Sequence, residues 1–138
     1  MPFILDTNII SELRKGAGRC NPNVWRWYDA TPMDEIYLSV LVLGEMRRGV
    51  EMKRKRDPET ARVFERWLLE VVLIHHERIM PINSEICDVW GRMAAKANIS
   101  TIDGLIAATA AHRGFTVVTR NTADFQRCGV DYINPFEA

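Results

Sequence analysis

Short apolar runs alternate along the chain with longer stretches in which apolar side chains recur at helical spacing. Five runs have the length of buried strands: residues 3–5, 36–40, 79–82, 115–119 and, more weakly, 130–133. Helical spacing covers four stretches: residues 41–55, 58–72, 86–97 and 102–113. A short helix is also expected through residues 11–13, capped by Thr7 or Asn8. The pattern therefore predicts strands and helices in alternation.

The residues that begin and end these elements agree with this interpretation. Asp57 and Pro58 supply a cap and a first helical residue, and Gly114 stands just past the end of a predicted helix. Strands that alternate with helices need crossover connections, which give a mostly parallel sheet covered by helices on both faces. We expect an α/β fold with a short sheet of four to five strands, formed by one domain over residues 1–138.

The composition mainly excludes classes of protein and of function. The 138 residues carry 18 Lys and Arg against 18 Asp and Glu, so the whole chain has no bulk attraction for nucleic acids or anionic membranes. Three cysteines without a CxxC spacing argue against a disulfide scaffold or a zinc ribbon and favour the cytoplasm. No signal peptide or membrane span is expected. Any function that depends on charge must therefore be local.

Polar side chains follow two of the predicted strands. Asp6 comes directly after residues 3–5, and a polar turn at residues 119–124 follows the fourth strand. Ligands of open parallel sheets bind outside the carboxyl ends of the strands. We therefore expect functional side chains at these two positions.

Two further acids lie on predicted helices among apolar neighbours. Glu45 shares a helix face with Leu41, and Asp103 lies in the first turn of an apolar helix beside Ile102. Burying a carboxylate on such a face is costly unless it is protonated, hydrogen-bonded or bound to a cation. Each acid alone also has a structural explanation, because Asp6 would cap a helix and Asp103 would interact well with a helix dipole.

Taken together, the acids indicate a metal site. They come from four separate segments, each at or near a predicted strand end: Asp6, Glu45, Asp103 and Asp124. Converging carboxylates repel one another, and Mg²⁺ or Mn²⁺ relieves that repulsion while activating water and stabilising charge on a phosphoryl oxygen. The sequence therefore predicts metal-assisted phosphodiester hydrolysis. Supporting hydrogen bonds would come from three side chains that equally suit an ordinary turn: Thr7, Thr119 and Asn121.

A basic run follows Glu45. Between residues 47 and 56, six cations accompany the single acid Glu51: Arg47, Arg48, Lys53, Arg54, Lys55 and Arg56. Such a run is usually a solvated helix face. Because the rest of the chain is then net acidic, the run is also the only concentrated patch in the sequence that would attract phosphates.

The chemistry-bearing residues belong to short motifs that occur in a characteristic order. These motifs are Phe3–Asn8, Leu38–Ser39, Gly44–Glu45, Ile102–Ala108, Thr119–Asn121 and Ile133–Phe136. In this order and spacing the chain resembles the PIN-domain ribonucleases, and specifically the VapC/FitB-type toxins of bacterial toxin–antitoxin pairs. The resemblance extends over nearly the whole chain.

The resemblance implies a PIN-like fold and an endoribonuclease that depends on Mg²⁺ or Mn²⁺. Asp6 and Asp103 match the principal metal-binding aspartates of the family, and Glu45 matches its third acid. Asp124 would reach the metal directly, through water, or only by orienting Asn121. The side chains expected to support the site are Thr7, Asn8, Thr119 and Asn121.

The same resemblance implies partners. They are an RNA substrate, whose phosphates the basic run would hold, and a cognate DNA-binding antitoxin that wraps the protein and blocks the acidic pocket. Homodimers or larger complexes are usual for such toxins.

Two other interpretations stay open. In a haloacid-dehalogenase-like phosphotransferase Asp6 would be a covalent nucleophile, although Asn8 stands where that family generally has a second aspartate. In a non-catalytic interaction module the acids would only cap helices.

Overall fold

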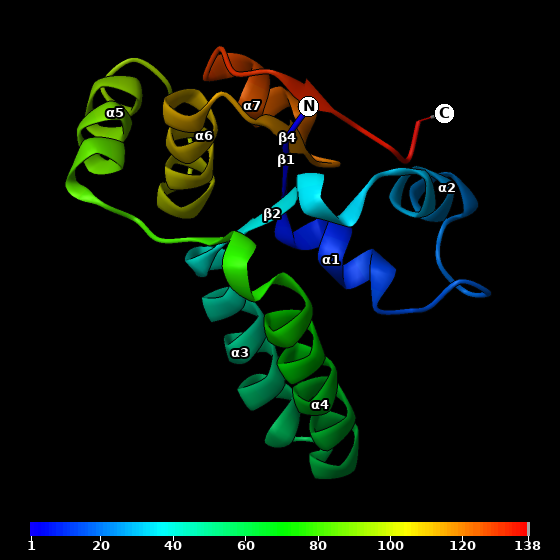
Figure 1. Cartoon of the computed structure of the whole chain (residues 1–138). Helices are drawn as coiled ribbons and strands as arrows, with labels where there is room; N and C mark the ends of the chain where they lie inside the picture. The colour runs from blue at the N-terminus through cyan, green and yellow to red at the C-terminus, as the bar shows by residue number, and fades with distance from the viewer. Residues whose placement is uncertain (138) are drawn as a thin grey trace.

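Five short strands form one parallel sheet in the computed structural model, which describes residues 1–137 (Figure 1). The strands are β1 (Phe3–Leu5), β2 (Ile36–Ser39), β3 (Ile79–Met80), β4 (Thr116–Val118) and β5 (Tyr132–Ile133). They lie in the order β3-β2-β1-β4-β5, and every neighbouring pair is parallel. The predicted parallel α/β fold is confirmed.

The strands are apolar because helices cover both faces of the sheet. Ile4, Leu38 and Val117 are fully buried, as are their neighbours Leu5 and Val118. Buried parallel strands are continuous apolar runs for this reason, without the alternation of a half-exposed strand. Each such side chain contributes roughly 1.5–3 kcal/mol relative to an exposed one.

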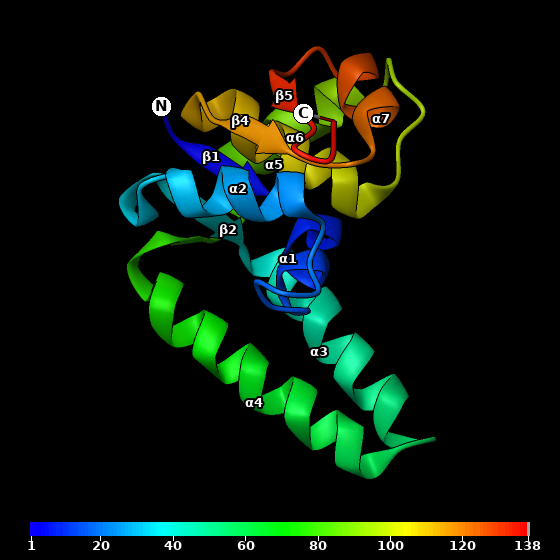
Figure 2. The same cartoon turned by 90° about the vertical axis from the view of Figure 1, so that its right-hand side faces the viewer.

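Helices form the two outer layers. They are α1 (Thr7–Leu13), α2 (Pro22–Ala30), α3 (Val40–Arg54), α4 (Pro58–His75), α5 (Ser84–Ala94), α6 (Thr101–Arg113) and α7 (Thr122–Arg127), with short 3-10 turns at Met33–Glu35 and His76–Arg78. Helices α1 and α2 lie on one side of the sheet and α5 and α6 on the other (Figures 1 and 2). Helices α3 and α4 pack together as a hairpin that projects beyond the sheet. No helix within residues 1–137 is both long enough and apolar enough to cross a bilayer.

Caps and a proline shift several predicted boundaries. The first helix is capped by Asp6, not by Thr7 or Asn8, because Asp6 accepts the Thr7 backbone N–H at 2.8 Å. Ser39 caps α3, so the second strand ends one residue early. The third strand stops before Pro81, which has no N–H for a ladder.

Several predicted helix and turn boundaries are wrong by more than one residue: α1 begins at Thr7 and not near residue 11, α4 continues to His75 beyond residue 72, and α5 begins at Ser84 before residue 86. Helix α5 ends at Ala94 and not at Ala97, because the chain closes into turns there, with the Ala97 N–H donating to the carbonyl of Met93. Of the polar turn predicted at residues 119–124, only residues 119–121 precede a helix, because α7 begins at Thr122.

The strand order creates a switch point between β1 and β4. From β1 the chain builds outward through β2 to β3, then crosses back to place β4 on the other side of β1. At such a point the connections leave the carboxyl ends of neighbouring strands in opposite directions, which opens a crevice for a ligand. Asp6 and Thr119 follow these two strands directly.

Candidate metal centre and the adjoining groove

Asp6 is fixed at the carboxyl end of β1 and is only 4% exposed. Its backbone N–H donates to the carbonyl of Val118 in β4 at 2.9 Å. Its Oδ1 accepts the Thr7 backbone N–H, while Oδ2 accepts the Thr119 hydroxyl at 2.8 Å and the Asn8 amide at 3.2 Å. Backbone and side chain are therefore both held in place, and the carboxylate has one orientation.

Thr119 connects the turns that follow β1 and β4. Its fully buried hydroxyl donates to Asp6 and accepts the backbone N–H of Asn121 at 2.9 Å. Asn8 makes a second connection, because its Oδ1 accepts the Arg120 backbone N–H at 3.1 Å. These hydrogen bonds hold the two turns that form the floor of the crevice.

Glu45 approaches from the second turn of α3. The helix starts at Ser39, the end of β2, so it leaves the same edge of the sheet that carries Asp6. The Thr7 hydroxyl donates to Glu45 Oε1 at 2.5 Å. Since Thr7 also gives its N–H to Asp6, it bridges the two acids.

Asp103 comes from the first turn of α6, where the Ser100 hydroxyl accepts its backbone N–H at 3.3 Å. The next residue, Gly104, allows an unusually close helix contact. A Cβ there would lie 2.9 Å from Nε1 of Trp90 on α5. The indole therefore packs directly on the turn that carries Asp103.

The three acids Asp6, Glu45 and Asp103 lie close enough to repel one another electrostatically. Burial raises the pKa of Asp6 to about 6, with Asp103 and Glu45 adding repulsion, while hydrogen bonds from Thr119 and Thr7 lower it. Burial also raises the pKa of Asp103, with further repulsion from Asp124 and Glu45. Within residues 1–137, none of Asp6, Glu45 and Asp103 has an ion pair with a cation. We call these three side chains the carboxylate cluster.

Asp124 lies near the cluster, but protein donors already satisfy it. The Asn121 amide donates to one of its carboxylate oxygens at 2.5 Å, and Arg127 pairs with the other. Its negative charge is therefore compensated, unlike that of Asp103 beside it.

The cluster fits a hard divalent cation surrounded largely by water. Within the described residues, no group of three or more His, Cys, Asp or Glu side chains is arranged to hold a metal ion. Mg²⁺ usually keeps several waters and takes only one or two carboxylates from the protein. One buried acid and two half-buried acids that repel one another and lack a cationic partner within residues 1–137 match this demand.

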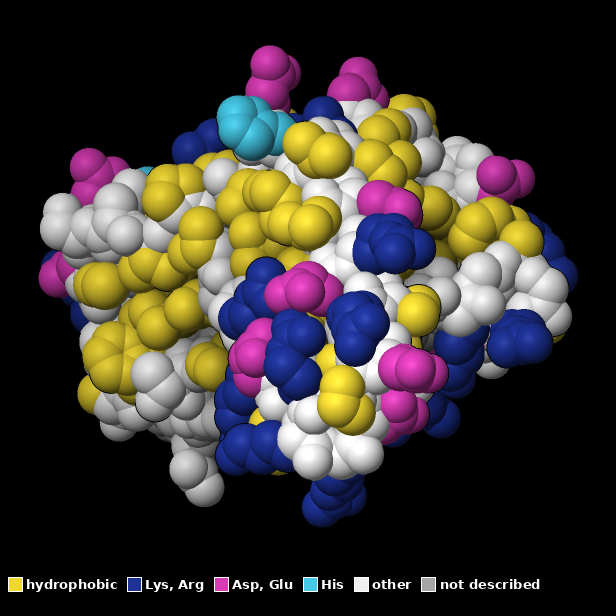
Figure 3. Space-filling model, turned by 90° about the horizontal axis from the view of Figure 1, so that it is seen from below, with side chains coloured by type: hydrophobic (Ala, Val, Ile, Leu, Met, Phe, Trp, Pro, Cys, Tyr) yellow, Lys and Arg dark blue, Asp and Glu magenta, His cyan; other side chains and the backbone are white. Residues whose placement is uncertain are grey.

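The basic run divides into paired and unpaired cations. Arg47 and Arg54 both bind the acids Glu51 and Glu65, at 2.5–3.2 Å. The other four members have no ion pair within residues 1–137: Arg48, Lys53, Lys55 and Arg56. The end of the molecule that carries the α3–α4 hairpin accordingly shows Lys and Arg mixed with Asp and Glu (Figure 3).

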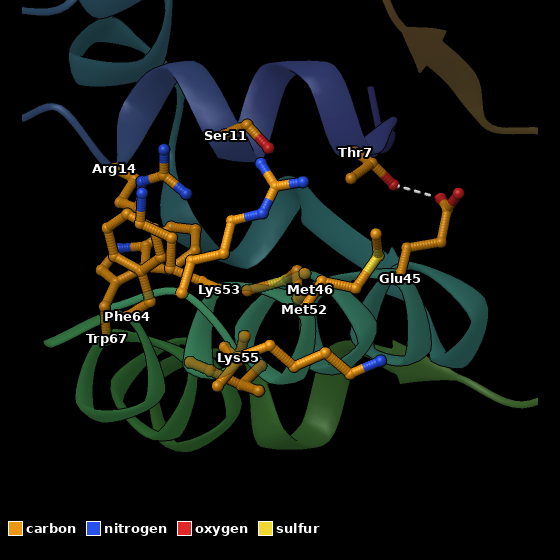
Figure 4. A pocket seen from close by; sticks show the side chains of 14 residues that line it. Thr7, Ser11, Arg14, Glu45, Met46, Met52, Lys53, Lys55, Phe64 and Trp67 are labelled. Carbon is orange, nitrogen blue, oxygen red and sulfur yellow. Dashed lines mark hydrogen bonds between the residues drawn. The ribbon is translucent and has the colours of Figure 1, made fainter. Parts of the chain in front are cut away.

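A groove of about 570 Å³ leads away from the cluster between α1, α3 and α4. Thr7 and Glu45 lie at one end and Phe64 and Trp67 at the other (Figure 4). Three unpaired members of the basic run line it: Lys53, Lys55 and Arg56. The structure therefore brings half of the predicted phosphate-binding cations to the same hollow as Glu45.

Sequence reasoning missed several residues around the cluster. Ser100 was detectable, because a serine directly before an apolar helix is a typical cap. The packing of Trp90 on Gly104 and the position of Arg14 in the groove depend on contacts between helices, and no local pattern signals them.

Comparisons with known proteins agree with this geometry. The PIN domain family profile matches residues 3–130. The chain is 35% identical to the VapC ribonuclease Y4jK of Sinorhizobium fredii (98% of each chain). It is 30% identical to the toxin FitB of Neisseria gonorrhoeae (97% of this chain, 98% of the relative). The crystal structure of FitAcB from Neisseria gonorrhoeae superposes with a TM-score of 0.89 at 29% identity, covering 99% of both chains. The fold, the motifs and these matches together show that the chain belongs to the PIN domain family.

Proposed function

We propose that this protein is a metal-dependent endoribonuclease, the toxin of a toxin–antitoxin pair, which hydrolyses RNA phosphodiesters at the carboxylate cluster. The observation that carries the proposal is the uncompensated negative charge of Asp6, Glu45 and Asp103 at the β1/β4 switch point of a PIN-family chain. Relatives named ribonuclease and toxin support the activity and its biological role.

Each acid has a distinct role in this proposal. Asp6 and Asp103 would hold Mg²⁺ or Mn²⁺, with Glu45 as the third acid. When bound, the ion supplies a water nucleophile of lowered pKa and stabilises charge on the phosphoryl oxygen. The hydrogen bonds from Thr119 and Asn8 hold the Asp6 carboxylate in one orientation.

Asn121 and Asp124 act beside the cluster. Because both Asp124 oxygens already accept from Asn121 and Arg127, we assign Asp124 the role of orienting Asn121. The Asn121 backbone in turn donates to Thr119, which holds Asp6. Asp124 is therefore a positioning residue for the site.

RNA enters through the groove. Lys53, Lys55 and Arg56 line it without any ion pair in the described part of the chain, so their charges are free to contact phosphates. Arg48 extends the same exposed helix face.

The partner in this proposal is a cognate DNA-binding antitoxin. The floor of the groove includes Met46, Phe64 and Trp67, which suit an apolar segment of a protein. A segment seated there would reach Glu45 and exclude RNA from the cluster. A homodimer or a larger complex is the expected assembly.

Two further expectations belong to this proposal. The buried apolar side chains form one core around one sheet, which supports a single domain over residues 1–138. Cys20, Cys87 and Cys128 are free thiols, which suits action on RNA in the reducing cytoplasm.

The decisive experiment is cleavage of labelled RNA by the purified protein. We expect internal cleavage in Mg²⁺ or Mn²⁺, none in excess EDTA, and recovery when Mn²⁺ is added back. Ca²⁺ should bind without supporting turnover, because its looser coordination shell positions the attacking water poorly. Full activity in EDTA would contradict the proposal, and a phospho-aspartate on Asp6 would point to a phosphotransferase instead.

A further inference from the structure

A second hollow lies beside the groove, between the end of α1 and α4. It has a volume of about 410 Å³, and four cations but only one acid line it: Arg14, Lys15, Arg19, Arg66 and Glu70. We call it the arginine cleft. The sequence pointed to the basic run as its only concentrated basic patch, yet the fold brings together three cations from the segment after α1 and one from α4.

Three of the four cations in the arginine cleft form no ion pair within residues 1–137, although the carboxylate of Glu70 lines the same hollow. Lys15 pairs with Glu12 at 3.0 Å, whereas Arg14, Arg19 and Arg66 have no ion pair within residues 1–137. Guanidinium groups that line one hollow repel one another, and an anion placed between them would relieve the repulsion. Their planar, forked donors match the oxygens of a phosphate.

The cleft is continuous with the groove that starts at the carboxylate cluster. Arg14, Phe64 and Trp67 line both hollows. The Arg14 guanidinium lies 4.1 Å from the centre of the Phe64 ring and 5.9 Å from that of Trp67. In Figure 4 these three side chains lie together at the end of the groove opposite Thr7 and Glu45. From Thr7 to Arg14 the helix rises about 10 Å, so the cleft is separated from the cluster.

We propose that the arginine cleft is a binding subsite for the single-stranded RNA that flanks the scissile bond. The inference rests on the proposed function. Aromatic faces combined with a cationic track are the means by which proteins hold single strands without reading sequence. The strand runs from the cluster along α1, passes Arg14 and its aromatic neighbours, and places phosphates against Arg19 and Arg66.

RNA fits the cleft better than an acidic protein segment does. A phosphate accompanies every nucleotide, so a strand that fills the groove brings a regular series of charges to the cleft. The aromatic rings at the junction of the two hollows offer surface on which bases can stack. A peptide rich in carboxylates has no flat ring that could stack there.

The test removes two exposed arginines, unpaired within residues 1–137, that line the cleft but not the groove. The Arg19→Gln/Arg66→Gln variant is compared with Arg26→Gln/Arg92→Gln, which loses the same charge from exposed arginines on α2 and α5. Both pairs are placed in the full chain carrying Asp6→Asn, and labelled single-stranded RNAs of about four and about twelve nucleotides are titrated at several salt concentrations.

We expect the cleft variant to weaken binding of the long RNA and to lower its log–log salt slope by about 1.4, from two lost phosphate contacts. Binding of the short RNA should match that of the control pair. In proteins that retain Asp6, the cleft variant should raise KM for the long RNA and leave kcat unchanged.

Equal salt slopes for the two pairs would overturn the proposal, as would a parent protein that binds long and short RNA equally. Unchanged RNA binding with weakened binding of a poly-glutamate peptide would assign the cleft to an acidic protein segment and overturn it as well. The proposed function is tested separately, because it fails if the unmodified protein cleaves no RNA of either length or cleaves it fully in excess EDTA, and neither result depends on Arg19 or Arg66.

Discussion

The carboxylate cluster and the basic run both concentrate charge, but the fold treats them in opposite ways. Asp6 is buried, repelled by Asp103 and without a cationic partner in the described chain. Arg47 and Arg54 are only partly exposed, and they share the acids Glu51 and Glu65. A buried, uncompensated charge is costly unless a ligand completes it, whereas exposed ion pairs contribute little. Unpaired charge is therefore a better sign of function than charge density.

Removing one charge from the cluster should have the largest effect. Asp6→Asn keeps the size of the side chain but removes the principal ligand charge, so we expect ribonuclease activity to fall by at least about a hundredfold. The measurement is cleavage of labelled RNA in Mg²⁺, together with Mn²⁺ binding by calorimetry.

The same variant distinguishes an acid that binds the metal from an acid that only supports the fold. Because the substitution relieves repulsion with Asp103, the metal-free protein should keep its melting temperature or gain stability. Asp29→Asn, at an exposed position on α2, is the matched control and should change neither property. Near-normal cleavage by Asp6→Asn protein would exclude Asp6 from the metal site.

The next prediction disturbs the cluster without touching a carboxylate. In Gly104→Ala the new Cβ would meet Nε1 of Trp90 at 2.9 Å, so the α5–α6 contact must shift. We expect a cost of about 1–3 kcal/mol in stability from overpacking. Mn²⁺ affinity should fall as well, because Asp103 is the preceding residue.

A control and a rescue make this prediction specific. Gly91→Ala on α5 meets no atom within 4 Å and should raise the free energy of unfolding by up to about 1 kcal/mol. Adding Trp90→Phe to Gly104→Ala frees space at the contact and should restore part of the Mn²⁺ affinity. Unchanged affinity in the Gly104→Ala variant would show that the contact does not position Asp103.

The pH dependence of stability tests the electrostatic half of the comparison. Asp6 has a pKa of about 6 in the folded chain and 3.8 as its ordinary value, so the folded state holds the proton more tightly. The metal-free protein should therefore gain stability as the pH falls from 6 towards 3.8, by at most about 3 kcal/mol. The check is the melting temperature across this range, with and without Mn²⁺.

The Asp6→Asn variant isolates this contribution. The pKa of buried His75 is lowered, so protonation of His75 at acid pH acts in the opposite direction. Asp103, whose pKa is also raised by burial, adds a gain in both proteins. The difference between parent and variant cancels both effects, so the larger gain in the parent reports Asp6. Mn²⁺ competes with the proton and should stabilise the parent more at pH 7 than at pH 5. A parent and variant with identical pH profiles would contradict the burial of an uncompensated Asp6.

The fold and the three acids of the carboxylate cluster could be predicted from the sequence, because both depend on the local order of residues. Apolar strands are recognised residue by residue, and Asp6 follows its strand directly, although the cap of α1 was expected at Thr7 or Asn8. The carboxyl ends of parallel strands share one edge, so Glu45 and Asp103 could be expected near it.

Ion-pair partners that lie on different helices could not be predicted from the sequence in this way. Glu65 on α4 neutralises Arg47 and Arg54 on α3, which are 18 and 11 residues away along the chain. Arg127 does the same for Asp124. The arginine cleft likewise forms only when α1 and α4 pack. Sequence patterns locate charges, whereas the tertiary structure decides which of them remain available.

The smallest expected effect comes from within the basic run itself. Lys53→Gln/Lys55→Gln and Arg47→Gln/Arg54→Gln remove the same net charge from the same helix region, but only the lysines are unpaired and line the groove. The lysine pair should lower the salt slope of RNA binding by up to about 1.4, whereas the arginine pair should leave it nearly unchanged. Long-range attraction falls equally in both variants, so the difference in slope reports phosphate contacts alone. Binding is measured in the Asp6→Asn background, so that the RNA stays intact. Equal slopes would mean that pairing with Glu51 and Glu65 does not decide which cations meet RNA, and the contrast between paired and unpaired charge would lose its basis on this surface.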